Sequence, residues 1–409
     1  MSWLRLGAAV LALVTVLVGC TGTTENVPPL LLAVGRQDPT NASAYQMVLV
    51  EDDFPNQPRL VLVPNSAVAL PYAAVASDVV DRAGARTDMV VLTRDPNGGT
   101  APASALVTLA LTGIDPTAPT AFTAGTPLQL TGGVTPVFSG SAGPWCFSSV
   151  TVSRDGRYAF LIDDPNACAA SPLVGAVVRL YQLDTGNGQV TQIAPSSPVQ
   201  ATAPLDDQVD VKERLTFLVS GTSDAQVYQV DVPYAASQGA PTLLGTLPGL
   251  AQLALGSNGT ELLAITNSQP YGTPVGVSSS LEATALPVKG AGKSIATVDG
   301  ARAMAADPTG INPRVVVAGY QQSAVHASPT DTKFVTTPTN YGLTGVAVAM
   351  DPLNNFGYVV GNGRIVLLDL LDAQQYGVSN AIPTTELTLP QDAGGRYLTA
   401  VARTRALIP

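Results

Sequence analysis

The stretch Val150–Asp164 reads VTVSRDGRYAFLIDD and predicts a β-hairpin. Its first four residues alternate apolar and polar side chains, and this period of two is typical of a strand. Asp155-Gly156 predicts a two-residue type I′ turn, which needs positive φ at both central positions. The run Tyr158–Ile162 that follows is apolar on both faces, so we expect a strand packed between two neighbouring sheets, as in stacked propeller blades.

The same unit recurs along the chain. Leu180–Asp184 (LYQLD) and Val227–Asp231 (VYQVD) end in aspartates 47 residues apart, and Ile365–Asp369 (IVLLD) ends 138 residues further on, three times 46. Copies of the hairpin half lie at 209–221, 253–266, 305–319 and 346–361, with poorer copies at 31–50 and 73–92. Four strands in a period of about 40–50 residues are propeller spacing. The sequence therefore predicts an all-β protein with a single β-propeller of about seven four-stranded blades, with six or eight as alternatives.

The repeat core also carries a family resemblance. SRDGRYAFL at 153–161 resembles the SPDGRYAYV core of YVTN-type, lactonase-like propeller repeats, and GVAVAMDP at 345–352 with FGYVV at 356–360 is similar in the same way. The resemblance covers residues 146–370 well and the first 145 poorly. It implies the propeller architecture, but proteins that share this architecture include enzymes, envelope proteins and binding scaffolds, so it leaves the activity open.

The first 19 residues predict a signal peptide. Arg5 gives a small positive region, and Leu6–Gly19 is an uncharged, mostly apolar run of 14 residues, too short for a spanning helix of about 20. The run ends in LVGC at 17–20, which is similar to the bacterial lipobox. That resemblance implies cleavage between Gly19 and Cys20 and lipidation of Cys20, including its new amine. A plain secretory signal with a chance cysteine is the alternative. Thr21 in place of an aspartate favours the outer membrane, where there is one.

The expected organisation is a signal peptide at 1–19, a lipidated tether at 20–29 and a propeller domain at 30–409. Without Arg5 the mature chain has a net charge of −11, and no basic stripe is seen, so nucleic acid is not an expected partner. We expect the protein in the bacterial cell envelope, attached to the membrane by its lipid and facing away from the cytoplasm.

Cys146 and Cys168 flank the best hairpin, and antiparallel pairing of its strands brings them to the same end of the blade. An oxidising compartment follows from the signal sequence, so we predict a disulfide. A metal-binding pair or two free thiols is the alternative.

No catalytic residue is predicted. His326, the single histidine, falls in the polar run QQSAVHAS at 321–328 and is interpreted as an exposed loop residue. Adjacent carboxylates such as Asp163-Asp164 point to opposite faces of a strand and form no ready acid–base pair. That pair and Asp95–Gly99 could bind Ca²⁺, but turn chemistry explains both, so no cofactor or metal is predicted.

The leading functional hypothesis is a binding or scaffolding module for an envelope protein or glycan. Candidate anchors in loop-like context are Phe138, Trp145 and Tyr271, although each could equally be core; the long loops 113–143 and 267–280 are candidate binding loops. The alternative is a lactonase-like hydrolase that uses Arg, Asp and Glu at one mouth of the ring; a weaker third is a sensor with its ligand in the central channel. Finally, we expect the C-terminal tail, 391–409, to pair with the strand near Leu30–Val34 and close the ring.

Overall fold

The computed structural model describes the strands and many of the connections beside them. These residues are 31–52, 60–82, 85–97, 104–113, 127, 129–135, 145–169, 175–193, 198–201, 205–206, 213–220, 224–248, 250–255, 261–266, 278–285, 287–288, 293–299, 303–306, 315–318, 323–326, 347–350, 356–361, 364–369, 378–381 and 401–404. Among them, the only helices are two short 3₁₀ turns, η1 (Pro165–Ala167) and η2 (Ala236–Gln238). None of the described helices has the length and apolar character needed to cross a membrane.

The strands form seven antiparallel sheets, which we number along the chain. Sheet 1 contains β1 (Leu31–Asp38), β2 (Asn41–Asp52), β3 (Leu60–Leu62), β4 (Val68–Leu70) and β29 (Val401–Thr404). Sheet 2 contains β5 (Ala73–Arg82), β6 (Ala85–Arg94), β7 (Ser104–Thr112) and β8 (Gln129–Thr135). Sheet 3 contains β9 (Phe147–Val152), β10 (Tyr158–Asp163), β11 (Arg179–Asp184) and β12 (Val190–Ile193).

The other four sheets follow in chain order. Sheet 4 contains β13 (Pro198–Ala201), β14 (Leu205–Asp206), β15 (Glu213–Ser220), β16 (Asp224–Asp231) and β17 (Thr242–Pro248). Sheet 5 contains β18 (Leu250–Leu255), β19 (Glu261–Thr266), β20 (Ser278–Ala285) and β21 (Lys293–Asp299). Sheet 6 contains β22 (Ala303–Ala306), β23 (Val315–Ala318) and β24 (Ser323–His326). Sheet 7 contains β25 (Ala347–Met350), β26 (Phe356–Gly361), β27 (Arg364–Asp369) and β28 (Val378–Ala381).

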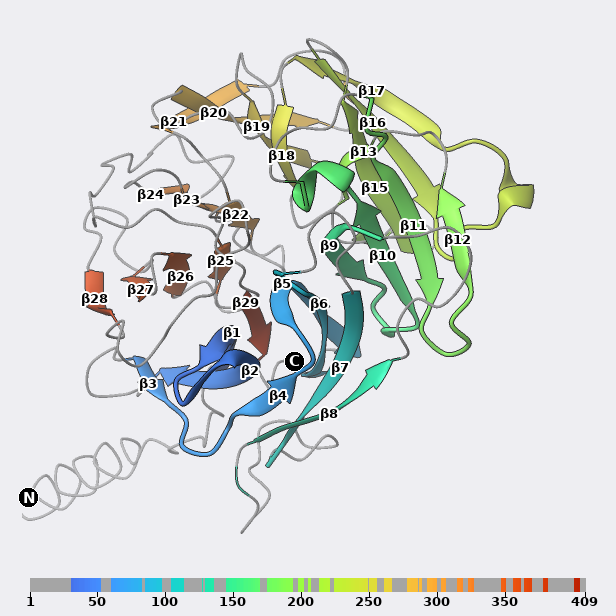
Figure 1. The fold of residues 1–409 in the computed structure, drawn as a ribbon. Helices are drawn as coiled ribbons and strands as arrows, with labels where there is room; N and C mark the ends of the chain where they lie inside the picture. The colour runs from blue at the N-terminus through green and yellow to red at the C-terminus, as the bar shows by residue number, and fades with distance from the viewer. Residues whose placement is uncertain are drawn as a thin grey trace, which may run out of the picture.

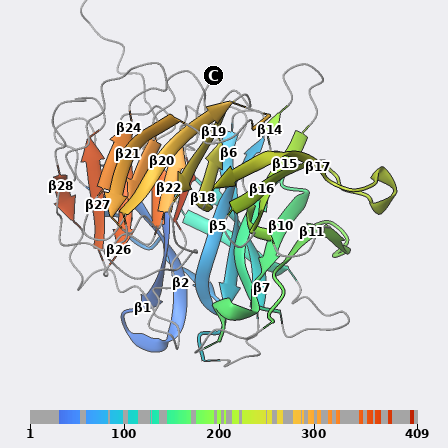
Figure 2. The ribbon, with the colours of Figure 1, turned by 90° about the horizontal axis from the view of Figure 1, so that it is seen from above.

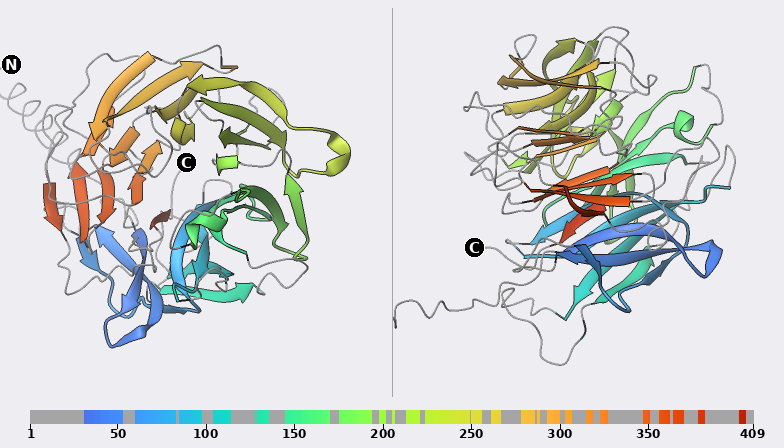
Figure 3. Two further views of the ribbon diagram at one scale, coloured as in Figure 1. Left: turned by 45° about the horizontal axis from the view of Figure 1, so that its top comes forward. Right: turned by 90° about the vertical axis from the view of Figure 1, so that its left-hand side faces the viewer.

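The sheets stand around a common centre (Figure 1; Figure 3, left). Their innermost strands contact one another in turn, β29 with β5 and then β9, β13, β18, β22 and β25, and β25 contacts β29 again. Figure 2 shows the same sheets from above, with the strands of each sheet side by side. The prediction of an all-β propeller is confirmed. The number of blades stays a prediction, while the described residues form seven sheets.

Strand β10, the second strand of the hairpin at 150–164 and a central strand of sheet 3, packs on both faces, as predicted. Ala159 and Leu161 of β10 belong to an apolar cluster shared with sheet 2, and Phe160 and Ile162 belong to one shared with sheet 4. All four are at most 2% exposed. Burying such a side chain contributes about 1.5–3 kcal/mol when it is large. This explains why the strand has no polar face.

The turn of this hairpin differs from the predicted type I′ turn. Ser153 N donates to Tyr158 O at 2.8 Å and Gly156 N donates to Ser153 O at 2.8 Å, so four residues lie between the paired ends. Gly156 has a φ of 70°, whereas Asp155 is not among the described residues with positive φ. The Asp155 carboxylate instead accepts hydrogen bonds from Ser153 Oγ (2.7 Å) and Arg157 N (2.9 Å). These side-chain bonds favour the longer turn, because an aspartate that bonds its own neighbours mimics a backbone turn.

The recurring aspartates occupy the same place in three sheets. Asp184, Asp231 and Asp369 are the last residues of β11, β16 and β27. The Asp184 carboxylate accepts from Gly186 N at 2.9 Å and from Asn187 Nδ2 at 3.1 Å, so it stabilises the turn that follows its strand. Asp231 instead accepts from Arg214 Nε at 3.2 Å. The equivalent aspartate therefore stabilises a turn in one sheet and a cross-strand ion pair in another.

The ring closes with strands from both ends of the chain. Leu31, Leu32, Ala33 and Val34 of β1 pair antiparallel with Thr404, Arg403, Ala402 and Val401 of β29. These four residues of β1 are at most 1% exposed. The predicted pairing of the C-terminal tail with the first strand is confirmed for residues 401–404; the rest of the tail lies outside the described residues.

The placement of His326 corrects the sequence interpretation. The residue ends β24, where it is opposite Val315 of β23, and so it lies in a strand and not in a loop. Its polar surroundings in the sequence were misleading because the pattern SAVH is too short for a period of two to be recognised.

Candidate functional site

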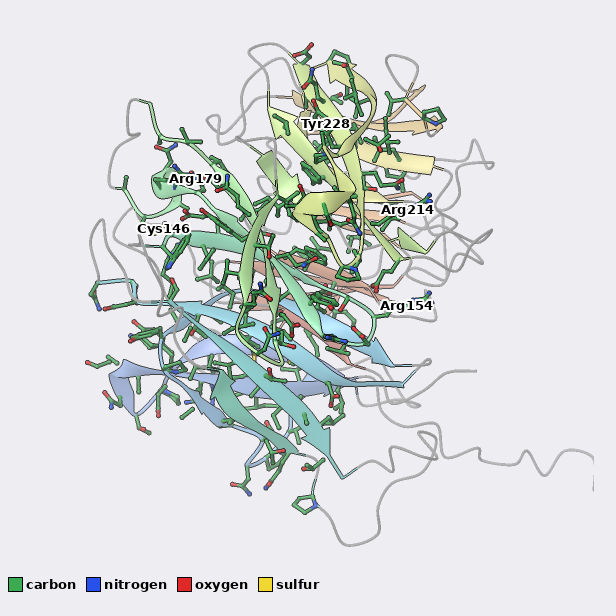
Figure 4. The ribbon with its side chains drawn as sticks, turned by 90° about the vertical axis from the view of Figure 1, so that its right-hand side faces the viewer. Cys146, Arg154, Arg179, Arg214 and Tyr228 are labelled. Atoms are coloured by element: carbon green, nitrogen blue, oxygen red, sulfur yellow. A yellow bond between two sulfur atoms is a disulfide. The ribbon has the colours of Figure 1, made fainter. Side chains whose placement is uncertain are left out.

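Different connections and side chains lie at the two ends of the ring. The disulfide end is defined by the connection from Asp163 to Arg179 in sheet 3, and the Gly156 end by the connection from Ser153 to Arg157. Figure 4 shows Cys146 and Arg179 toward one side and Arg154 and Arg214 toward the other. The strands of sheet 3 run from one end of the ring to the other. A side chain near the terminus of a strand therefore belongs either to the disulfide end or to the Gly156 end.

An aromatic cluster lies at the disulfide end. The Trp145 ring stacks on Phe147 with centroids 5.4 Å apart and meets the Tyr181 ring edge-on at 4.9 Å. Phe147 is 1% and Tyr181 8% exposed, while Trp145 is half-buried and packs against the cluster between sheets 2 and 3. Such offset aromatic pairs contribute about 0.5–1.5 kcal/mol beyond their area burial. Trp145 is therefore both part of the core and part of the surface.

A disulfide holds the residue next to this tryptophan. Cys146 and Cys168 are bonded, with their Cα atoms 5.9 Å apart, which confirms the predicted bridge. Asp164 N donates to Cys146 O at 2.9 Å, and the Asp164 side chain caps η1 by accepting from Asn166 N at 2.9 Å. Cys168 ends η1. The bridge, the backbone bond and the cap thus fix the start of the long connection against β9.

A buried arginine from sheet 2 contacts the region around Trp145 and the Cys146–Cys168 disulfide, which we call the Trp145 corner. Arg94, 4% exposed, donates from Nη1 to Phe147 O at 3.0 Å and lies 3.6 Å from Cys146 Sγ. A charged donor to a buried carbonyl is among the stronger hydrogen bonds, worth about 1.5–3 kcal/mol. Arg94 therefore fixes the backbone beside Trp145 relative to the neighbouring sheet.

Asp163 accepts the second backbone bond at this corner. Its Oδ1 accepts from Cys146 N at 2.8 Å, and the residue is 4% exposed. Burial raises the pKa of the Asp163 carboxyl, while the bond from Cys146 N and the charge of Arg179 oppose that rise and Asp164 adds to it. Burial also raises the pKa of Tyr181. Asp163 is thus a structural acceptor, and Arg179 is the nearby cation that favours its charged form.

The predicted site residues are only partly brought together. Trp145, Cys146 and Cys168 meet at one corner. Phe138 and Tyr271, and the candidate lipidation and cleavage residues Gly19 and Cys20, lie outside the described residues. The loops 113–143 and 267–280 lie largely outside them too, apart from residues such as those of β8 in the first loop and the start of β20 in the second.

Sequence reasoning missed Arg94 and Tyr181 at this corner, and it considered Asp163 only together with Asp164, as a turn or Ca²⁺ site. Arg94 ends the apolar run MVVLTR, and Asp163 ends AFLID. A charge at the end of an apolar strand was a usable signal. Spacing along the sequence was a second usable signal. Arg94 and Phe147 are 53 residues apart. Gln182 and Tyr234, whose backbone exchanges hydrogen bonds with the Gln182 side chain, are 52 residues apart. Both distances are close to one repeat.

Arginines and carboxylates gather at the Gly156 end of sheets 3 and 4. Arg154 N donates to Glu213 Oε1 at 2.6 Å, and Arg157 and Arg214 form ion pairs with Asp184 (3.7 Å) and Asp231 (3.2 Å). Exposed pairs of this kind contribute about 0–1 kcal/mol. Within the described part of the chain, no three His, Cys, Asp or Glu side chains are grouped as metal ligands would be.

Comparison with known proteins supports the fold. No protein-family model matches the chain, and a search of curated proteins found no match. Among solved structures, a putative 6-phosphogluconolactonase from Bacteroides fragilis is similar over 94% of this chain and 99% of its own, with 12% identity and a TM-score of 0.52. A functionally unknown protein from Desulfotomaculum acetoxidans is similar over 91% and 99%, with 10% identity and a TM-score of 0.50. Hydrazine synthase from Kuenenia stuttgartiensis has a TM-score of 0.49, at 12% identity over 84% and 99%. At these identities the likeness concerns the propeller fold alone.

Proposed function

We propose that this propeller is a lipid-anchored binding module of the bacterial cell envelope, which contacts a protein or glycan partner through its disulfide end. The observation that carries the proposal is the Trp145 corner. A half-buried indole is held on two buried rings, and the two residues that follow it are fixed by a disulfide, Arg94 and Asp163. A rigid, partly exposed aromatic side chain loses little conformational entropy on binding, and tryptophan is enriched among residues that dominate interfaces.

The binding part is tested at Trp145. We expect Trp145→Ala to weaken binding of the envelope partner by about 30-fold or more, as for a central aromatic anchor worth about 2 kcal/mol. The measurement is native pull-down of the lipidated protein from envelope extract, followed by titration of the recovered partner.

Two further variants make this test specific. Trp145→Phe keeps an aromatic ring over Phe147 and should retain part of the affinity. Leu243→Ala removes a 50% exposed apolar side chain from sheet 4 and should leave binding unchanged. Equal loss in the Leu243 variant, or full binding by Trp145→Ala, would count against the proposed surface.

The anchor is tested at Cys20. The run LVGC at 17–20 supports lipidation there. Cys20→Ser removes the side chain that forms the thioether, so we expect no processed, lipidated protein in the membrane fraction and we expect the precursor to remain uncleaved. Cell fractionation and immunoblotting measure both. Membrane retention with normal processing would contradict the anchor.

A lactonase-like hydrolase is the second candidate. It is favoured by Arg154, Glu213 and Arg214, which lie together at the Gly156 end. A panel of lactones and sugar-phosphate lactones, with and without Ca²⁺, separates the candidates: turnover that disappears in Arg214→Ala but persists in Trp145→Ala would favour the enzyme.

A further inference from the structure

The first strand of the propeller starts at the Gly156 end. Arg94, the last residue of β6, contacts Phe147, so β6 ends at the disulfide end. Asp95 follows Arg94 directly. The pKa of Tyr45 is raised by burial and then by the charge of Asp95, so Tyr45 lies near the same end of the ring. Tyr45 pairs with Gln37 beside the β1–β2 turn. β1 therefore ends at the disulfide end, and Leu31 starts it at the opposite end.

The closing strand gives the same direction. Thr404, the last residue of β29, pairs with Leu31. β29 is the innermost strand of sheet 1 and contacts β5 of sheet 2, and β5 runs toward the Gly156 end, because Val80 near its end is the nearest neighbour of Gly156. The innermost strands of consecutive propeller sheets run in the same direction, so β29 also runs toward the Gly156 end. Thr404 therefore lies at that end, and so does Leu31, with which it pairs. Both chain ends of the described propeller thus emerge on one side.

The tether is short compared with the ring. Ten residues separate Cys20 from Leu31. Fully extended, they span at most about 35 Å. β1 has eight residues and is about 26 Å long, and β2 and the outer strands β3 and β4 add about 10 Å of width outside it. A tether that passed around sheet 1 to the disulfide end would be stretched to its full length, at a large cost in chain entropy.

From this geometry we infer that the propeller is held with its Gly156 end toward the membrane and its disulfide end, with Trp145, pointing away from it toward an envelope partner. The inference rests on the proposed lipid anchor at Cys20. It makes the disulfide end the interaction surface, and it makes the Arg154–Arg214 region the side that faces the lipid headgroups.

The experiment compares the two ends of one sheet. Gln189 lies in the exposed β11–β12 connection at the Gly156 end, and Val177, 36% exposed, lies before β11 at the disulfide end. β11 separates them by about 20 Å. Gln189→Cys and Val177→Cys are labelled with a fluorescent maleimide without reductant, and the lipidated proteins are inserted into preformed phosphatidylethanolamine–phosphatidylglycerol vesicles that contain an acceptor lipid.

We expect energy transfer to the acceptor lipid to be clearly greater from residue 189 than from residue 177. A tether lengthened by 20 Gly/Ser residues after Pro29 should reduce this difference, since a longer chain lets the ring turn over. Flotation of the vesicles reports the anchor separately. Proteins that do not float would contradict the anchor itself, whereas proteins that float but show equal or reversed transfer would overturn the orientation.

Discussion

Deletion of residues 391–409 is expected to destabilise the propeller severely, by more than about 4 kcal/mol, which is beyond the range of ordinary point substitutions. The deletion removes β29, which pairs with Leu31–Val34 and contacts the inner strands on both sides. The four partners in β1 are essentially fully buried and would face water with unpaired backbone groups. Urea unfolding of the detergent-solubilised protein, followed by tryptophan fluorescence, measures the loss.

A shorter truncation provides the control. Removal of residues 405–409 leaves all four paired residues of β29 in place, so the unfolding midpoint should stay close to that of the full chain. If deletion of 391–409 also leaves the midpoint unchanged, the strand pairing does not close the ring.

Loss of the Cys146–Cys168 disulfide should cost on the order of 3 kcal/mol, the entropy of closing a loop of its length. Cys146 is 3% exposed, so Ala is preferred to Ser in the double variant, since a buried hydroxyl would add a desolvation cost. The same unfolding titration gives the difference from the oxidised protein. Intact-mass measurement after alkylation should show two modified thiols only after reduction.

Adding a reductant distinguishes the stability contributed by the disulfide bond from that contributed by the packing of the two side chains. It should lower the stability of the natural chain and leave that of Cys146→Ala/Cys168→Ala unchanged. If both respond equally, or if the oxidised protein already alkylates at two thiols, the bridge does not provide this stability.

The architecture was predictable because it repeats. A period of two and an apolar strand without a polar face can both be recognised within a single unit, such as Val150–Asp184, and Asp184 and Asp231 mark the repeat between units. The disulfide followed from the same hairpin, since its strands bring both cysteines to one end. The β1–β29 pairing followed from the need of any closed ring to cover its edges.

Contacts between units were not predictable in the same way. Arg94 and Phe147 belong to different sheets, and no local pattern records that an arginine of one will bind a carbonyl of the next. The type of the Asp155-Gly156 turn was missed because side-chain bonds from Ser153 and Asp155 outweigh the dipeptide preference. The sequence left Trp145 open between a binding anchor and a core residue for a similar reason: its stacking on Phe147 and Tyr181 depends on the tertiary arrangement.

The use of both chain ends in sheet 1 also sets an order of events during synthesis. β29 leaves the ribosome roughly 370 residues after β1, which at about 5–20 residues per second is about 20–70 s. Throughout that interval one edge of β1, four apolar residues long, has no native partner. An open apolar edge is a template for pairing with other chains. The synthesis of β29 therefore determines when the nascent protein stops being prone to aggregate through β1.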